Sequence, residues 1–177
     1  MKRFAITLSM ALFGMLAVQA QGNFSAGLSG GIPIGDAGDF ATFAIAVDLG
    51  YLFEISDDFE AGPVTGYSHS FGDSETLDIG TLGMVEIDYD DAQFIPIGGR
   101  AKWNFADSFS LAGDIGYAIG VNSGNDGGFY YSPRLAYGVT EALDIVAAYR
   151  GVALDGGSWD IISLGVDFTF GQGSSEE

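Results

Sequence analysis

Strict alternation of large apolar residues with small or polar residues is the feature that most constrains how this 177-residue chain can fold. The alternation recurs in eight segments of about a dozen residues, and no window after Ala20 shows a convincing helical period. Such segments are longer than the roughly 5 to 6 residues of a soluble strand and suit tilted strands that cross a membrane. The predicted strands are Asn23–Ile34, Ala41–Ile55, Phe59–Phe71, Ala92–Phe105, Phe109–Val121, Gly128–Val139, Leu143–Leu154 and Trp159–Phe170.

The connectors between these strands alternate in length. Three-residue connectors, 56–58, 106–108 and 140–142, follow the second, fourth and sixth strands, whereas the others are rich in Gly and Asp and mostly longer. Short turns at one rim and long loops at the other are typical of transmembrane barrels, whose short turns are periplasmic. The sequence therefore predicts an all-β fold over residues 21–170: an eight-stranded antiparallel up-and-down transmembrane β-barrel.

Residue parity within each strand predicts which face points into the barrel. In the fifth strand, Phe109, Leu111 and Ile115 alternate with Ser110, Ala112 and Asp114, and the other strands repeat this division. Small residues suit the narrow interior of an eight-stranded barrel, so the large apolar face is expected to meet lipid. The alternatives are a soluble barrel with an aromatic core and a lipocalin-like carrier. Both require the large apolar residues to point into the barrel.

Aromatic residues are concentrated near the strand ends on the outward parity, as in the two interfacial girdles of membrane barrels. The short-turn rim is expected to hold Phe24, Tyr51, Phe53, Phe59, Trp103, Phe105, Phe109, Tyr137, Phe168 and Phe170, and the opposite rim Phe43, Tyr67, Phe71, Phe129 and Tyr131.

The N-terminal residues 1–20 have the pattern of a cleaved secretory signal peptide, with two basic residues, a short apolar run and the end Val18-Gln19-Ala20. A retained anchor is the alternative. The chain has no cysteine, and beyond residue 20 only four basic residues stand against all 24 acidic ones, a net charge of −20. Such acidity argues against a nucleic-acid partner.

The last predicted strand contains Ser163, Gly165, Phe168 and Phe170, and this pattern looks like the C-terminal signal by which the barrel-assembly machinery recognises outer-membrane proteins. Over residues 23–170 the chain resembles small outer-membrane β-barrel proteins of the OmpA/OmpX-like type, including single-domain members from Bacteroidetes-like bacteria. The resemblance implies a location in the bacterial outer membrane, with lipid and the assembly machinery as partners. The polar tail 171–177 departs from members that end on the aromatic residue, and it is too short for a peptidoglycan-binding domain.

Charged residues on the inward parity form the first candidate site. A lumen charge must be paired or hydrated, so we expect an ion-pair network that plugs the barrel, with a polar path for small ions as the alternative. Its predicted members are Asp48, Glu60, Arg100, Lys102, Asp114, Arg134, Asp144, Arg150 and Asp167, and Glu54 shares their parity.

Two further candidates lie near the long-loop rim. His69 is the single histidine, but its neighbours Ser68 and Ser70 point to the opposite face, so a headgroup-level rim residue is favoured over a hydrolase dyad. Residues 73–91 hold seven acids, and Glu86, Asp88, Asp90 and Asp91 are weak Ca²⁺ candidates without the EF-hand order. Parity also continues through this segment, with Leu77 and Ile79 following the third strand and Val85 and Ile87 leading into the fourth. We therefore expect a protruding hairpin with a turn at residues 80–83.

These features predict a non-enzymatic membrane protein with a structural or surface-interaction role and specificity in its extracellular loops. A narrow pore or small-solute channel is the alternative. No cofactor is expected, and the sequence does not identify the surface partner.

Overall fold

The computed structural model describes residues 22–78, 80 and 84–170. The predicted signal peptide, the polar tail 171–177, Ile79 and most of the predicted hairpin turn lie outside these residues. Within them, no helix has the length and apolar character needed to cross a membrane.

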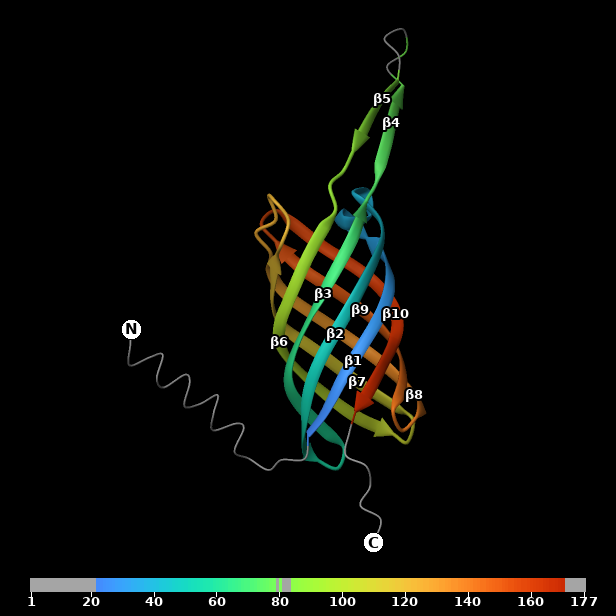
Figure 1. Cartoon of the computed structure of the whole chain (residues 1–177), viewed down its shortest axis with the longest axis vertical. Helices are drawn as coiled ribbons and strands as arrows, with labels where there is room; N and C mark the ends of the chain where they lie inside the picture. The colour runs from blue at the N-terminus through green and yellow to red at the C-terminus, as the bar shows by residue number, and fades with distance from the viewer. Residues whose placement is uncertain (1–21, 79, 81–83, 171–177) are drawn as a thin grey trace, which may run out of the picture.

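Eight long strands close into one antiparallel barrel (Figure 1). Each barrel strand pairs with the next barrel strand along the chain, so that β3 pairs with β6. The last strand, β10, closes the sheet by pairing with β1, from Phe24↔Phe170 to Ile34↔Asp160. This is the predicted up-and-down topology. The barrel strands are β1 (Gly22–Ile34), β2 (Ala41–Ser56), β3 (Phe59–Gly72), β6 (Ala92–Ala106), β7 (Phe109–Gly120), β8 (Gly128–Thr140), β9 (Leu143–Leu154) and β10 (Gly157–Phe170).

The three short connectors are tighter than the predicted tripeptides. Each is a two-residue turn preceded by a register shift in the strand before it, at Glu54/Ser56, Asn104/Ala106 and Gly138/Thr140. A bulge adds one residue to the strand and increases its twist, which explains why the first residue of each predicted tripeptide belongs to the sheet. The connector between β9 and β10 is also only Asp155 and Gly156, with Gly156 at φ 97°, because an Asp-Gly pair suits a tight hairpin.

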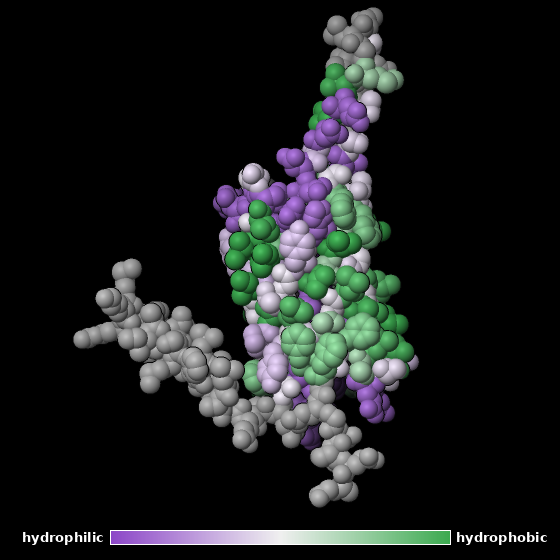
Figure 2. All heavy atoms as spheres, viewed as in Figure 1, coloured by the Kyte–Doolittle hydropathy of each residue, from purple (hydrophilic) through white to green (hydrophobic). Residues whose placement is uncertain are grey.

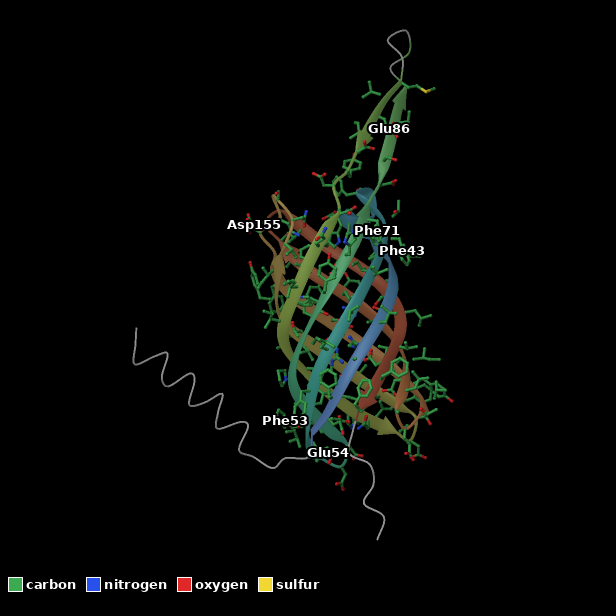
Figure 3. The ribbon with its side chains drawn as sticks, viewed as in Figure 1. Phe43, Phe53, Glu54, Phe71, Glu86 and Asp155 are labelled. Atoms are coloured by element: carbon green, nitrogen blue, oxygen red, sulfur yellow. The ribbon has the colours of Figure 1, made fainter. Side chains whose placement is uncertain are left out.

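The outside of the barrel is an apolar band. Figure 2 shows hydrophobic side chains gathered over the barrel wall, with hydrophilic side chains above them at the rim and on the hairpin. Mid-strand residues on the outward parity are well exposed, including Ile115 and Leu164 at 63% each. Phe43 and Phe71 lie at the rim nearest the hairpin, whereas Phe53 lies at the opposite end (Figure 3). The band and its aromatic ends match the predicted facing.

The interior has two layers, and only one was predicted. The layer toward the short turns is ionic, and its buried charged residues are Asp48, Arg100, Asp114, Arg134 and Arg150. The layer toward the long loops is an apolar cluster of Ala92, Phe94, Ala118, Tyr130 and Val152, with Leu154 and Trp159 packed against it. The expectation that inward residues are all small or polar is therefore wrong in this half of the barrel. Here the lumen is filled by aromatic side chains, which supply enough volume without charge.

A separate two-stranded sheet projects from one end of the barrel (Figure 1). It consists of β4 (Ser74–Asp78) and β5 (Met84–Asp88), paired from Ser74↔Asp88 to Asp78↔Met84. The predicted hairpin is thus present, but it is not a continuation of the barrel ladder, because β3 ends at Gly72 and β6 begins at Ala92. A short 3₁₀ helix, η1 (Gly35–Asp39), occupies the loop between β1 and β2.

Candidate functional sites in the barrel interior and at its outer rim

Arg100 and Asp114 form a buried, bidentate ion pair in the lumen. They face each other across β6 and β7, and the guanidinium donates two hydrogen bonds, Nε to Oδ1 at 2.6 Å and Nη2 to Oδ2 at 2.8 Å. Asp114 is only 2% exposed. A bidentate pair fixes both side chains in one orientation, so it forms a rigid centre for the surrounding charges.

Arg134 and Arg150 extend this pair into a network across the lumen. Arg134 donates to Asp48 Oδ2 at 3.1 Å and to Asp167 Oδ2 at 2.7 Å, and its Nη1 lies 3.6 Å from Asp114. Arg150 donates to both carboxylate oxygens of Asp48. The three arginines and the three aspartates balance in charge, which satisfies the requirement that buried ions be paired.

A second, more exposed cluster lies toward the short-turn rim. Lys102 Nζ is 3.7 Å from Glu60 Oε1 and 3.9 Å from Asp144 Oδ2, and Asn104 Nδ2 donates to Glu60 at 3.1 Å. Glu54 shares the inward parity, but it is exposed at this end of the barrel, as Figure 3 shows. The structure thus places six of the nine predicted lumen residues in the arginine–aspartate network and the other three, Glu60, Lys102 and Asp144, in this second cluster, and it leaves Glu54 outside both.

The lumen has almost no free volume. One cavity of about 30 Å³ lies among Asn23, Lys102 and Arg134, and another of about 10 Å³ lies between Arg150 and Trp159. A single water needs roughly 10 to 15 Å³ by this kind of measure, so the larger cavity has room for about two or three waters and the smaller for about one.

His69 and Asp91 form a polar contact on the outside of the rim. This contact was not predicted from the sequence. His69 Nε2 lies 2.9 Å from Asp91 Oδ2, and Tyr67 Oη lies 3.2 Å from His69 Nδ1. Asp91 also accepts a hydrogen bond from the Gly72 amide at 2.9 Å. This backbone hydrogen bond, with nearby His69, holds the pKa of Asp91 below its ordinary value.

This arrangement fastens the base of the hairpin rather than forming a hydrolase site. Ser70 points into the barrel, where it is fully buried and accepts a hydrogen bond from Trp159 Nε1 at 3.0 Å. In a hydrolase triad the serine lies at histidine Nε2, but here Asp91 occupies that nitrogen and the Tyr67 hydroxyl lies at Nδ1.

The four weak Ca²⁺ candidates are spread along the segment. Glu86 and Asp88 are exposed on β5, Asp90 is exposed below the hairpin, and Asp91 is engaged with His69. Among the residues that the structure describes, no three His, Cys, Asp or Glu side chains lie close enough to hold a metal ion.

The residues of the proposed assembly signal are all in β10. Ser163 is buried and its hydroxyl donates to the Ala148 carbonyl at 3.3 Å, while Gly165 pairs with Ser29 of β1. Phe168 and Phe170 are exposed on the outer face, and the Phe170 ring lies 5.9 Å from that of Phe24. The pattern therefore spans the closing seam of the barrel.

A closed eight-stranded antiparallel sheet with an apolar outer face and a filled interior defines the class of small transmembrane β-barrels. No protein-family profile matches the chain, and no curated protein matches it by sequence. Among solved structures, the chain is similar to Ail, the attachment invasion locus protein of Yersinia pestis, with 15% identity over 86% of this chain and 100% of that one and a TM-score of 0.53. The N-terminal β-barrel domain of Pseudomonas aeruginosa OprF is similar at 16% identity, with the same coverage and a TM-score of 0.51. A designed transmembrane β-barrel is also similar, at 12% identity over 86% of this chain and 98% of that one, with a TM-score of 0.52. These comparisons establish the shared fold.

Proposed function

We propose that this protein is a non-enzymatic outer-membrane barrel that anchors a recognition element at the cell surface. The observation that carries the proposal is the contrast between its two ends: the lumen is filled, whereas the β4–β5 hairpin stands clear of the barrel (Figures 1 and 3). A filled lumen supports an anchoring role over a narrow pore, because the interior cavities are too small to join.

The location in the outer membrane is part of this proposal. The apolar band with aromatic ends suits a lipid bilayer, and residues 1–20 suit export through a cleaved signal peptide. We assign membrane lipid as the partner of the band and the barrel-assembly machinery as the partner of β10 during insertion. Under this assignment, the turns at residues 57–58, 107–108 and 141–142 are periplasmic and the hairpin is extracellular.

The hairpin has the chemistry of a recognition surface for a basic, extended polypeptide. Each strand has only one partner, so the outer edges of β4 and β5 leave backbone donors and acceptors free for another strand. Residues 73–91 hold seven acids and no base. Met84, Val85 and Ile87 are 76%, 45% and 36% exposed and add apolar contact area on the same strand as Glu86 and Asp88.

A binding assay with a matched control tests this role. Cells that produce the intact chain are compared with cells in which residues 74–88 are replaced by a short Gly-Ser turn, using an immobilised peptide of alternating Lys and Thr as the probe. The account predicts that both chains reach the outer membrane as heat-modifiable barrels and that only the intact chain retains the peptide. An alternating Glu and Thr peptide should bind neither. Equal retention by both chains would contradict the assignment of the hairpin.

A further inference from the structure

An open cavity of about 250 Å³ lies at the mouth of the barrel, between the base of the hairpin and the loop that joins β7 to β8. We call it the outer vestibule, and its lining includes Phe40, Tyr89, Asp90, Asn122, Leu154 and Trp159. It is far larger than the two lumen cavities and close to the lower end of the roughly 300 to 1,000 Å³ typical of small-ligand pockets.

The floor of the vestibule is aromatic and firmly held. Trp159 packs on the interior apolar cluster, with its ring centroid 6.4 Å from that of Phe94. Its indole Nε1 donates to Ser70 at 3.0 Å, which fixes the plane of the ring. An ordered aromatic floor loses little side-chain entropy when a ligand settles on it.

The walls of the vestibule are tied together before any ligand arrives. On one side, Asp73 N–H donates to the Phe40 carbonyl and Tyr89 N–H donates to the Asp73 carbonyl, both at 2.9 Å. The Phe40 and Tyr89 rings meet edge to face, with centroids 5.2 Å apart. These contacts hold one wall to the base of the hairpin.

Two asparagines fix the opposite wall. Asn122 Nδ2 donates to the Asp91 carbonyl at 2.8 Å, and Asn125 Nδ2 donates to the Gln93 carbonyl at 3.0 Å. Because their amides are engaged in the wall, they are not the groups that select a ligand. The site is therefore preformed.

The charge in the vestibule has one sign. Asp91 is engaged with His69 and Gly72, but Asp90 is exposed and has no ion-pair or side-chain hydrogen-bond partner among the described residues. The four basic residues beyond residue 20 are all in the two lumen clusters, on the far side of the Phe94 and Trp159 floor. A free carboxylate in a cavity that aromatic rings also line favours a cation, because carboxylates and ring faces both attract positive charge.

We propose that the outer vestibule binds a small organic cation with an apolar body. Its ammonium group lies between Asp90 and the rings of Phe40 and Tyr89, and its apolar part rests on Trp159 and Leu154. A neutral ligand gains only the apolar contact, and an anion is repelled by Asp90. This site is separate from the recognition surface on β4 and β5, and it does not depend on the role proposed for the hairpin.

Trp159 provides the reporter for a direct test. The chain has two tryptophans, so Trp103→Phe leaves Trp159 as the single tryptophan, which is excited selectively over the tyrosines. This variant, folded in micelles of a polyoxyethylene detergent at constant ionic strength, is titrated with phenethylammonium, with neutral 2-phenylethanol and with anionic 3-phenylpropanoate. Ring attraction and Asp90 together should make the cation bind about tenfold more tightly than the alcohol, and the anion should not saturate.

Charge removal gives the decisive comparison. Asp90→Asn should weaken binding of the cation about fivefold and leave the alcohol unchanged, whereas Asp107→Asn, at the opposite rim, should change neither. The backbone amide signals of residues 122–125 in the unmodified chain provide a second readout that does not need the Trp103 substitution. Equal affinity for cation and alcohol, an Asp90→Asn effect no larger than that of Asp107→Asn, or no saturable change in either readout would overturn the proposal.

Discussion

Substitution of Arg100 by methionine should destabilise the barrel by about 3 to 5 kcal/mol. Asp114 would keep only Arg134, whose Nη1 lies 3.6 Å away, in place of two short hydrogen bonds. A carboxylate that is 2% exposed cannot replace those bonds with bulk water, so its desolvation is left largely uncompensated. Methionine keeps the apolar part of the arginine side chain. The decrease in the free energy of unfolding therefore measures the loss of the charged group rather than the loss of side-chain volume.

Urea unfolding in micelles measures this effect. With a slope of about 2 kcal/mol per molar urea, the midpoint should fall by roughly 1.5 to 2.5 M. Lys102→Met is the matched control, because Lys102 is 21% exposed and its carboxylates are 3.7 and 3.9 Å away, so its loss should cost no more than about 1 kcal/mol.

The double variant Arg100→Met/Asp114→Leu distinguishes two causes of destabilisation. One is the cost of burying an unpaired Asp114 carboxylate, and the other is the loss of the Arg100–Asp114 interaction itself. Removal of both partners should recover much of the stability, because no uncompensated carboxylate remains at the centre of the lumen. If Arg100→Met is as stable as Lys102→Met, or if the double variant is no more stable than Arg100→Met, the reasoning about the plug is wrong.

Three other predictions concern the seam, the rim and the hairpin. Phe168→Ser/Phe170→Ser should reduce the yield in outer-membrane fractions and leave unfolded protein in the periplasm, and normal insertion would remove the assembly argument. Because the pKa of Asp91 is depressed below 3.8, its contact with Gly72 stabilises the rim above that pH and is lost as the pH falls through the lower folded value. The Gly72 amide shift should therefore titrate with a midpoint below 3.8, and a midpoint at or above 3.8 would refute the contact. Amides paired between β4 and β5 should exchange more slowly than those of an open loop but faster than those of the barrel, since an isolated two-stranded sheet is only marginally stable. Exchange as fast as in an unstructured peptide would eliminate the hairpin.

Parity was the most informative part of the sequence because the side-chain period of a strand is fixed by its geometry. It predicted the facing of Arg100 and Asp114, and the strand ends agree with the structure to within about two residues. It could not assign Asp48 to Arg150, which are 102 residues apart and meet only because the sheet closes. Partner choice across a barrel depends on closure and stagger, which no local pattern contains.

The apolar layer could have been found from the same parity. Phe94 has the parity of Arg100 in β6, and Trp159 has the parity of Ser163 in β10, so both belong inside by simple counting. Phe94 and Trp159 were not predicted to face inward because all large apolar residues were assigned to the lipid face. A narrow lumen must nevertheless be filled by side chains along its whole length. The contact between His69 and Asp91 was missed because it depends on the register of β3 against β6, in which His69 lies opposite Gln93, and Asp91 comes just before β6.

The central claim is that the barrel lumen is sealed and that the recognition elements lie outside the membrane. Planar-bilayer recording tests this most directly, because a sealed lumen does not conduct ions. The full chain, inserted into a bilayer in molar salt, should show no discrete conductance steps at either polarity. Its insertion is checked independently by heat-modifiable migration of the recovered protein. Reproducible ohmic steps from inserted, fully folded protein would contradict the account and establish the barrel as a pore.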